Sequence, residues 1–398
     1  MHKICIVTGT RAEYGLLKPL IEKVSESNKA ELMLVVTGTH LSRKFGHTVD
    51  VIEQDGFDIC ARIDLELDEQ DALSAANESE AAAHITDSMA IAIREFGRFF
   101  SKNNPDIVVL LGDRYETLMV ATAAMMNRIP IAHLHGGEIT EGAVDDAIRH
   151  SITKMSHLHF ASTEGHRNRI IQLGEAADRV FNVGAPGVEN VLKLKCLEGE
   201  ELWNKLGRSF EDGKKLAVMT YHPETLGSAS AVAQIEEIFA FLDNHPEINV
   251  VITGANADCE GGVINNLLEK YAKENSERCS FFMSLGQLRY FSLLKKCSFV
   301  IGNSSSGIIE VPSFRIPTIN IGDRQKGRTR AKSVVDCSCD RASIEEAYKV
   351  INDNNFSEAL KNMNNPYEGD STSEKIYEII IDNLNQGIDI QKKFVDIH

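Results

Sequence analysis

The chain lacks an excess of positive charge. Its 398 residues include 42 Lys and Arg against 58 Asp and Glu, which gives a formal net charge of -16. A nucleic-acid-binding protein needs a basic face that displaces counterions from phosphates, so this charge argues against nucleic acid as a partner. A few local arginines can still draw an anionic small ligand into one cleft.

The sequence also lacks a long apolar run. No stretch approaches the roughly 20 residues that a membrane-spanning helix needs. The first residues, MHKICIVTG, read as a strand without the apolar core of a signal peptide. The eight cysteines form no CxxC pair, which is typical of free thiols in a reducing compartment. We therefore expect a cytoplasmic protein with no membrane partner.

Apolar strands and helical segments alternate along the chain, which predicts parallel sheets covered on both faces and hence an α/β fold. Helices are expected over about 12–25, within 66–100 (as 75–83 and 89–100), and over 115–126, 145–155 and 372–385. The expected strands are Lys3–Val7, Leu32–Val36, Ile107–Leu111, Ile129–Ala132, Leu158–Ala161, Val180–Val183, Leu216–Thr220, Val250–Thr253, Ser280–Met283, Phe299–Ile301 and Thr318–Ile321.

The strand pattern restarts after a charged segment at about 191–215, and the length exceeds what one core supports. We expect two Rossmann-like doubly wound domains, over residues 1–188 and 189–370. A C-terminal helical segment, 371–398, is expected to pack back on the first domain. Ligands of open α/β sheets bind beyond the carboxyl ends of the strands, so the cleft between the domains is the expected site.

Two corners of the first half follow predicted strands. In VTGTRAEYG, a glycine turn leads into a helix start, where amides and Arg11 could hold a phosphate. The alternative is a structural turn with a solvated arginine. In LGDRYE, Asp113 follows a buried strand and is either a chemical carboxylate or a helix N-cap. GxGxxG is absent, so a dinucleotide site is poorly supported.

The segment HLHGGE follows the strand expected at 129–132. His133 and His135 would share one face of a strand, which zinc could use, but neither HExxH nor a cysteine set accompanies them. We therefore expect His133 to be packed. Crowded carboxylates raise one another's pKa, so Asp113, His135, Glu138 and Asp145 suit proton transfer better than metal binding.

Two corners of the second half could hold an anion. His222 in YHPE could donate to a phosphate oxygen, or be a plain turn residue. IGNSSSGIIE places serines at a helix start without the lysine of a Walker loop, and Glu310 one turn later could accept from ribose hydroxyls. Arg324 directly follows the last expected strand. A phosphate cradle in each half beside a carboxylate cluster indicates an enzyme acting on a nucleotide-linked substrate.

The corner motifs resemble a known family in their order and spacing. TGTRAEYGLL, GDRYE, HGGE, DDAIRHSITKMSHLHF, YHPETL, GNSSSGIIEVPS and INIGDRQKGR, spread over about residues 3 to 330, are similar to those of the hydrolysing UDP-N-acetylglucosamine 2-epimerases, in the branch of sialic and legionaminic acid synthesis. The resemblance implies a GT-B architecture, a homodimer, a UDP-sugar substrate, and neither a metal nor another cofactor. It also implies a role in capsule polysaccharide formation.

The resemblance further implies the reaction and its residues. UDP leaves C1 and a proton leaves C2, giving 2-acetamidoglucal, and water then adds with inversion at C2. Asp113 and Asp145 match catalytic carboxylates. His135 stands where much of the family has glutamate, so His135 or Glu138 would fill that role. The residues implied to bind UDP or the substrate are Arg11, Arg114, His222, Ser304, Ser305, Ser306, Gly307, Glu310 and Arg324.

Other functions fit parts of the pattern. The same reaction could act on UDP-2,4-diacetamido-2,4,6-trideoxyglucose, the substrate on the legionaminic acid route. A glycosyltransferase of the same architecture would need an acceptor and would not release free sugar into water. A non-catalytic UDP-sugar-binding protein would leave its ligand intact, and a non-hydrolysing epimerase would keep UDP attached. The acid/base cluster favours the hydrolysing epimerase among these.

Overall fold

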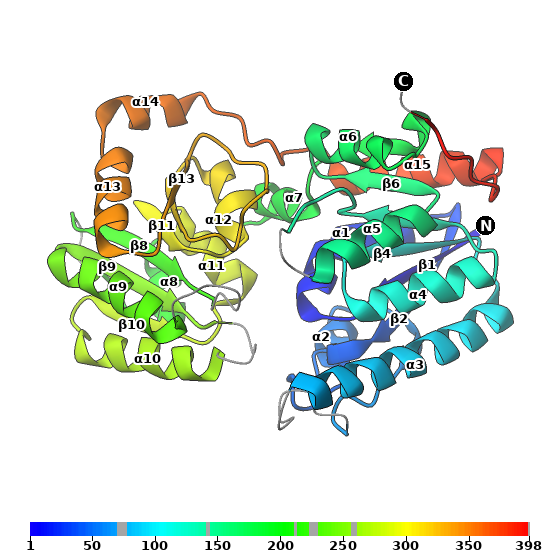
Figure 1. The fold of residues 1–398 in the computed structure, drawn as a ribbon, viewed down its shortest axis with the longest axis horizontal. Helices are drawn as coiled ribbons and strands as arrows, with labels where there is room; N and C mark the ends of the chain where they lie inside the picture. Colours follow the sequence, from blue (N-terminus) through cyan, green and yellow to red (C-terminus); the bar gives the residue numbers. More distant parts are fainter. Residues whose placement is uncertain (70–77, 141–143, 211–212, 223–229, 256–260, 397–398) are drawn as a thin grey trace. The chain divides into compact units, whose positions relative to one another are not determined.

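The computed structural model describes residues 1–69, 78–140, 144–210, 213–222, 230–255 and 261–396 (Figure 1). The chain divides into two compact units. Unit 1 comprises Met1–Asn190 and Gly369–His398, and unit 2 comprises Val191–Glu368. Among the described helices, none combines the length and the apolar character that crossing a membrane would require.

Unit 1 is built on a parallel sheet with the strand order β3-β2-β1-β4-β5-β6-β7. The order reverses between β1 and β4, and in open α/β sheets ligands bind beside such a reversal. The strands are β1 (His2–Thr8), β2 (Ala30–Thr37), β3 (Ile59–Ile63), β4 (Ile107–Leu111), β5 (Ile131–Leu134), β6 (Leu158–Ala161) and β7 (Val180–Asn182).

Helices cover both faces of this sheet (Figure 1). Side chains alternate across a strand, so β1 buries Ile4 and Ile6 in a core with α1 and α15, and Cys5 and Val7 in a second core with α3 and α4. The helices of unit 1 are α1 (Arg11–Ser25), η1 (Gly38–His40), α2 (Val49–Gln54), α3 (Glu78–Asn103), α4 (Tyr115–Met126), α5 (Val144–Met155), α6 (Glu164–Gln172), η2 (Ala177–Arg179), α7 (Pro186–Lys193), which runs on into unit 2, and α15 (Thr372–Gln386).

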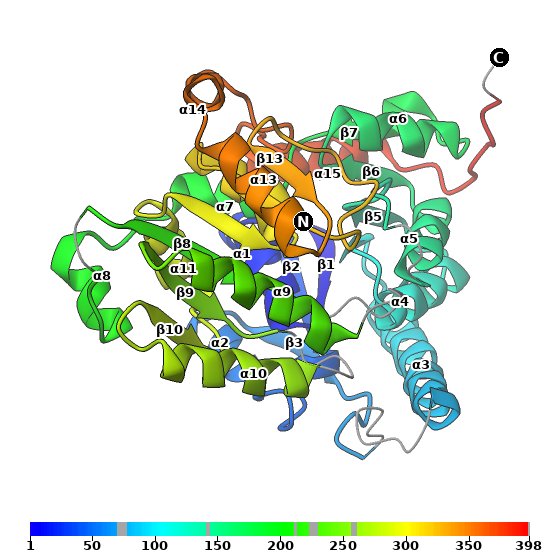
Figure 2. The same cartoon turned by 60° about the vertical axis from the view of Figure 1, so that its left-hand side comes forward.

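Unit 2 repeats the plan with the strand order β10-β9-β8-β11-β12-β13, again parallel. Figure 2 shows β8, β9 and β10 of this sheet beside the helices α9 and α10. β8 buries Ala217 and Met219 with α9 and α13, and Leu216 and Val218 with α8 and α11. The elements are α8 (Gly199–Leu206), β8 (Lys215–Thr220), α9 (Ala231–Asn244), β9 (Ile248–Thr253), α10 (Gly261–Glu274), β10 (Cys279–Phe282), α11 (Gly286–Leu294), β11 (Phe299–Gly302), α12 (Ser306–Ile309), η3 (Val311–Phe314), β12 (Thr318–Ile321), β13 (Val334–Cys337), α13 (Arg341–Ile351) and α14 (Asn354–Lys361).

Several elements differ from the sequence prediction, and β5 lies two residues later than the strand expected at Ile129–Ala132. β3 and β13 were not predicted, because both are short edge strands whose residues, Ile63 apart, are partly exposed or exposed, so neither gives the signal of a buried apolar run. The two helical stretches expected within 66–100 form one helix, α3, from Glu78 to Asn103, and residues 75–77 lie outside the described residues. The segment expected to join the domains contains helical residues of α7 and α8.

The end of the chain returns to unit 1 through α15. Ser373 donates from its backbone N–H, at 2.8 Å, to the Glu189 carboxylate, and Thr372 donates from its hydroxyl to the Val183 carbonyl at 2.8 Å. Ile376 and Ile380 then fill the core beside α1. These contacts tie a segment from the end of the sequence to the helix α1 near its beginning.

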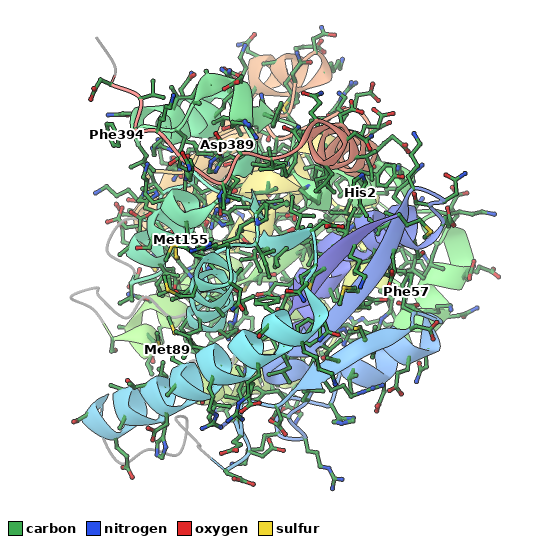
Figure 3. All side chains as sticks on the ribbon, turned by 90° about the vertical axis from the view of Figure 1, so that its right-hand side faces the viewer. His2, Phe57, Met89, Met155, Asp389 and Phe394 are labelled. Carbon is green, nitrogen blue, oxygen red and sulfur yellow. The ribbon has the colours of Figure 1, made fainter. Side chains whose placement is uncertain are left out.

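Residues after α15 cross the surface of unit 1 near α5 and α6, from Asp389 to Phe394 (Figure 3). The buried Glu175 carboxylate anchors this segment. It accepts from Lys392 Nζ at 2.7 Å, from Lys154 Nζ at 2.6 Å, and lies 3.1 Å from His159 Nε2. Despite burial, hydrogen bonds from His159 and the two lysines lower the pKa of Glu175 to about 2.

We expect Glu175→Gln to lower the free energy of unfolding of unit 1 by about 1–3 kcal/mol at pH 7, because two lysines then lose their buried counter-charge. A carboxyl with a depressed pKa stabilises the fold above its ordinary value of 4.5 and loses that contribution as pH falls toward 2. The difference between variant and parent should therefore shrink between pH 5 and pH 2.

Urea unfolding followed by circular dichroism measures this difference, and the fluorescence of Trp203, the single tryptophan, reports unit 2 separately. Glu164→Gln is the matched control, since Glu164 is an exposed carboxylate paired with Arg167 on the surface. A Glu175→Gln deficit that stays constant down to pH 2 would contradict this account of the anchor.

Candidate active site

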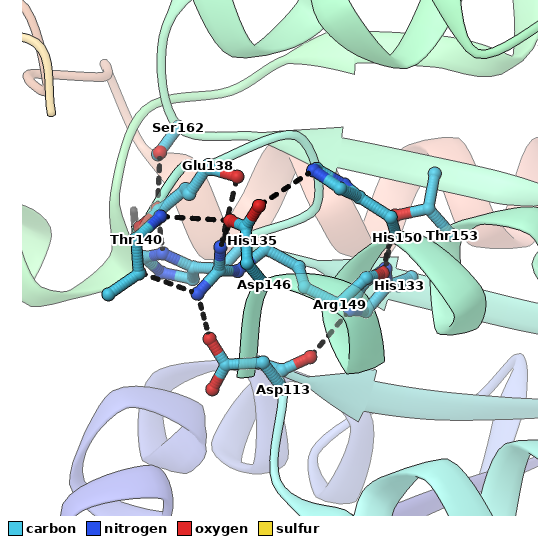
Figure 4. Close-up of polar contacts among 11 residues, drawn as sticks. Asp113, His133, His135, Glu138, Thr140, Asp146, Arg149, His150, Thr153 and Ser162 are labelled. Atoms are coloured by element: carbon cyan, nitrogen blue, oxygen red, sulfur yellow. Dashed lines mark hydrogen bonds and ion pairs between the residues drawn. The ribbon is translucent and has the colours of Figure 1, made fainter. Parts of the chain in front are cut away.

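The carboxyl ends of β4 and β5 bring three of the predicted acid/base residues together. After β4, Gly112 turns the chain with φ 82° and Asp113 follows. His135 and Glu138 lie in the turn that follows β5. Because β4 and β5 pair side by side, these side chains converge at one end of the unit 1 sheet (Figure 4).

A buried arginine that was not assigned from the sequence holds this cluster together. Arg149 of α5 is 1% exposed. Its Nη1 donates to the Glu138 carbonyl at 3.0 Å and to Asp146 Oδ1 at 2.9 Å, and its Nη2 donates to Thr140 Oγ1 at 3.0 Å and to the Asp113 carboxylate. The planar guanidinium therefore fixes groups from the β4 corner, the β5 turn and α5 at once.

A second line of contacts runs through the β5 turn. His135 Nδ1 lies 2.7 Å from Glu138 Oε1, and Ser162 Oγ donates to the same oxygen at 2.9 Å. His166 Nδ1 of α6 lies 2.9 Å from Ser162 Oγ. All four side chains are largely or fully buried. Figure 4 shows Ser162 and His135 approaching Glu138 from opposite sides.

The expectation that His133 and His135 share a strand face was wrong. β5 ends at Leu134, and His135 has φ 64°, which breaks the alternation of side chains. His133 is fully buried, as expected of a packed residue, with Nε2 2.8 Å from the Gly112 carbonyl oxygen and Nδ1 3.2 Å from Thr153 Oγ1. Burial lowers the pKa of His133 to about 3, so its ring is neutral at pH 7.

Asp145 is exposed on the first turn of α5. The neighbouring Asp146 makes the inward contacts: its Oδ1 accepts from the Thr140 N–H at 2.9 Å as well as from Arg149, and its Oδ2 lies 3.5 Å from His150 Nε2. A catalytic role for Asp145 stays a prediction, and Asp146 helps to anchor the cluster through Arg149 and Thr140.

The helix start at the β1 corner is occupied by the protein's own carboxylate. Thr10 caps α1 by accepting from the Glu13 N–H at 3.2 Å, and Glu13 Oε2 accepts from the Gly9 N–H at 2.7 Å. Arg11 is exposed at the first helical position. The phosphate site predicted at this corner therefore loses the Gly9 amide, and a ligand contact of Arg11 stays a prediction.

Glu13 and Glu116 are buried carboxylates that flank the partly exposed Arg114. Arg114 Nε donates to Glu116 Oε1 and lies 3.9 Å from Glu13 Oε1. Burial, followed by the charge of Glu116, raises the pKa of Glu13 to about 7. Arg114, predicted to contact substrate, is thus oriented by two carboxylates beside the β4 corner.

In unit 2 the predicted residues gather at the ends of β8, β11 and β12. The Asn303 amide clasps His222: its Oδ1 accepts from the His222 N–H at 2.7 Å, and its Nδ2 donates to the His222 carbonyl at 2.8 Å. Arg324 Nη1 donates to the Asn303 carbonyl at 3.2 Å. Burial, with the charge of Arg324 adding to it, lowers the pKa of His222 to about 4, so the ring is neutral at pH 7.

The serine segment follows β11 directly. Gly302 has φ 134°, and a Cβ there would lie 1.9 Å from the Thr220 carbonyl oxygen, so only glycine fits between β11 and β8. Ser304 and Ser305 precede the short helix α12, which begins at Ser306 and Gly307, and Glu310 follows it. Pro223 and the rest of the YHPETL motif lie outside the described residues.

The sequence interpretation missed the residues that hold the predicted ones in place. Arg149 and Asp146 stand three residues apart in DDAIRH, a helix spacing that brings side chains together and could have indicated the pair. The contacts of Ser162 with Glu138, of Asn303 with His222 and of Gln325 with Asn303 gave no such signal, because these partners lie 22 or more residues apart in the sequence. Among the described residues, no group of His, Cys, Asp and Glu side chains has an arrangement suited to a metal ion.

Comparison with known sequences places the chain among sugar-nucleotide enzymes. It is 39% identical over 401 residues to the polysialic acid biosynthesis protein P7 of Escherichia coli, covering 100% of this chain and 98% of that protein. It is also 39% identical over 396 residues to the GDP/UDP-N,N'-diacetylbacillosamine 2-epimerase (hydrolyzing) of Campylobacter jejuni, covering 100% and 99%.

The fold agrees with this relationship. The crystal structure of UDP-GlcNAc 2-epimerase from Neisseria meningitidis bound to UDP-GlcNAc superposes with a TM-score of 0.77 at 19% identity, over 97% of this chain and 100% of that one. The expected α/β class with two Rossmann-like domains of the GT-B type is confirmed. The family described as UDP-N-acetylglucosamine 2-epimerase matches residues 22–381. The chain therefore belongs to the UDP-N-acetylglucosamine 2-epimerase family of enzymes.

Proposed function

We propose that the chain is a hydrolysing 2-epimerase that converts UDP-N-acetylglucosamine and water into N-acetylmannosamine and UDP, for sialic acid synthesis. The observation that carries the proposal is the cluster of Asp113, His135 and Glu138 around buried Arg149 at the ends of β4 and β5. Hydrolysis is supported by the Campylobacter relative, whose name includes that activity.

The reaction requires groups that move protons at one carbon. In the first step a base takes the proton from C2, the C2–H electron pair becomes the C1=C2 double bond, and the C1–O pair leaves with UDP. In the second step water supplies a hydroxyl to C1, and a proton returns to C2 from the opposite face. The products are UDP and the free 2-epimeric amino sugar, so every atom of substrate and water is accounted for.

In unit 1 we assign Asp113, His135, Glu138 and Asp145 to this proton transfer. Arg149 holds one Asp113 oxygen, and 28% of the Asp113 side chain stays exposed, so the other oxygen is available to a ligand. His135 and Glu138 form a directly bonded acid/base pair. The His135 ring of this pair and the Asp113 carboxylate can then divide proton removal and proton return between them.

For the UDP group the remaining predicted residues supply positive charge and donors. Charge grows on the diphosphate as the C1–O bond breaks, so donors aimed at it lower the barrier. Arg324 contributes a guanidinium and neutral His222 a ring N–H, and Glu310 would accept from the ribose. The other proposed contacts are Arg11, Arg114, Ser304, Ser305, Ser306 and Gly307.

A second substrate has equal support from the comparisons. The relative named for polysialic acid synthesis and the one named for N,N'-diacetylbacillosamine are both 39% identical to this chain. The same site chemistry would serve UDP-2,4-diacetamido-2,4,6-trideoxyglucose, because both sugars carry the reacting hydrogen beside an acetamido group at C2. Only contacts at C4 and C6 distinguish them.

We expect purified protein in D2O, with a chelator present, to release UDP and N-acetylmannosamine carrying deuterium at C2 from UDP-N-acetylglucosamine. The deuterium enters because the proton returned to C2 comes from solvent. Proton NMR of the products measures both outcomes, and a parallel reaction with the diacetamido sugar nucleotide identifies the preferred substrate. Turnover that leaves UDP attached to the sugar, or no turnover of either substrate, would overturn the proposal.

Asp113→Asn should reduce kcat by on the order of 10³-fold, because an amide cannot exchange the proton, while UDP still binds. Calorimetric titration with UDP checks the binding, and the NMR assay checks turnover. Asp178→Asn, at an exposed carboxylate on η2, serves as the matched control and should retain full activity. Normal sugar release by Asp113→Asn would refute the assignment of this carboxylate.

Arg149→Lys should lower kcat by on the order of 10²-fold, because one ammonium cannot hold the acceptors that two guanidinium nitrogens hold. We also expect a loss of about 2–4 kcal/mol in the unfolding free energy of unit 1. Arg167→Lys on α6, whose guanidinium pairs with exposed Glu164, is the control. An Arg149→Lys enzyme within twofold of the parent kcat would show that this arginine does not organise the site.

A further inference from the structure

The turn after β5 combines a rare backbone conformation with a close approach. His135 is held at φ 64°, in the left-handed region that residues other than glycine seldom adopt. Two residues later, Gly137 has φ 75°, and a Cβ there would lie 2.3 Å from the His166 carbonyl oxygen. The turn therefore packs closely against the start of α6. In this conformation the Glu138 carboxylate lies beside the ring of His135.

The hydrogen bonds of this turn fix where each proton lies. A carboxylate only accepts, so His135 Nδ1 and Ser162 Oγ both donate to Glu138 Oε1. The Ser162 hydroxyl has one hydrogen, which is then committed to Glu138, so His166 Nδ1 must donate to Ser162 Oγ. The line runs His166, Ser162, Glu138, His135, with each donor pointing toward Glu138.

The second ring nitrogen of His135, Nε2, lies at the end of this line of hydrogen bonds. His135 Nε2 is buried and has no hydrogen-bond partner among the described residues. In the neutral tautomer with the hydrogen on Nδ1, Nε2 carries the lone pair. Buried polar atoms without a partner are rare in native structures and coincide with functional sites when the backbone is also strained.

We propose that Glu138, Ser162 and His166 are positioning residues that hold His135 in the Nδ1–H tautomer, and that His135 Nε2 is the atom that takes a proton from C2 of the sugar. The proposal rests on the proposed function and deepens it. In the step, the C2–H bond breaks and the Nε2–H bond forms, the freed pair becomes the C1=C2 bond, and the C1–O pair leaves with UDP. Glu138 stabilises the imidazolium that results.

The alternative is that these hydrogen bonds only stabilise the turn. The pH dependence of kcat distinguishes this structural role from the catalytic one. The Glu138 charge favours the protonated ring, so removing it should shift the acidic limb of the kcat profile to lower pH. Several other titratable or charged groups lie on β5, on α5, just beyond β4, and on β6 and α6, and they remain unchanged in that variant. They are His133 of β5, Asp113 beyond β4, Asp146 and Arg149 of α5, His159 of β6, and His166 and Arg169 of α6.

The kinetic test uses Glu138→Gln, Ser162→Ala and Ser162→Thr. Ser162→Ala should lower kcat roughly tenfold with KM changed less than twofold, the size of one lost hydrogen bond, and Ser162→Thr should recover most of the activity. Ser156→Ala is the matched control, because its buried hydroxyl donates only to the Ile152 carbonyl, at 2.7 Å. Parent kcat in Ser162→Ala, or an unshifted acidic limb in Glu138→Gln, would overturn the inference.

A second measurement does not depend on catalysis. It therefore tests the proposal even where the kinetic variants fail to fold. Nitrogen-15 NMR of the histidine-labelled parent protein, with the His135 signals assigned from their loss in His135→Gln, should show Nδ1 protonated and Nε2 unprotonated at neutral pH. The opposite tautomer would overturn the inference. Failure of the parent to turn over either UDP-sugar would instead refute the proposed function and, with it, the catalytic half of this inference.

Discussion

The candidate site depends on one buried positive charge. A guanidinium taken out of water is costly unless its donors are paired, and Arg149 meets this requirement with two carboxylates, a hydroxyl and a backbone carbonyl. Those four groups come from three separate segments of unit 1. Satisfying the arginine therefore fixes the Asp113 corner against the β5 turn and leaves the His135 ring beside them.

The fold could be predicted from the sequence wherever strands are buried on both faces. β4 and β6 were predicted with their observed bounds, because each is a short apolar run between polar corners. The edge strands β3 and β13 escaped detection, since nearly all their residues are partly exposed or exposed and so lack the signal of a strand buried on both faces. Register and strand order are set by pairings between distant segments, which a single sequence does not reveal.

The sequence predicted which strand ends carry the site residues, but not the contacts between their side chains. Parallel strands end at one edge of a sheet, so Asp113 and Glu138 could be expected to converge. The alternation of side chains along a strand did not predict the turn at His135, because the chain leaves the strand there and the turn packs Gly137 against α6, which lies far along the sequence. Arg149 was overlooked because arginine in a charged helix is ordinarily exposed, and only tertiary contacts bury it.

The most direct measurement is a crystal structure of the protein with an intact UDP-sugar bound to a slow variant. We expect C2 of the sugar to lie within about 4 Å of His135 Nε2, because proton transfer needs hydrogen-bond distance. We also expect a carboxylate oxygen of Asp113 to contact the sugar ring. A sugar ring seated away from the Arg149 cluster, with C2 facing neither residue, would contradict both expectations.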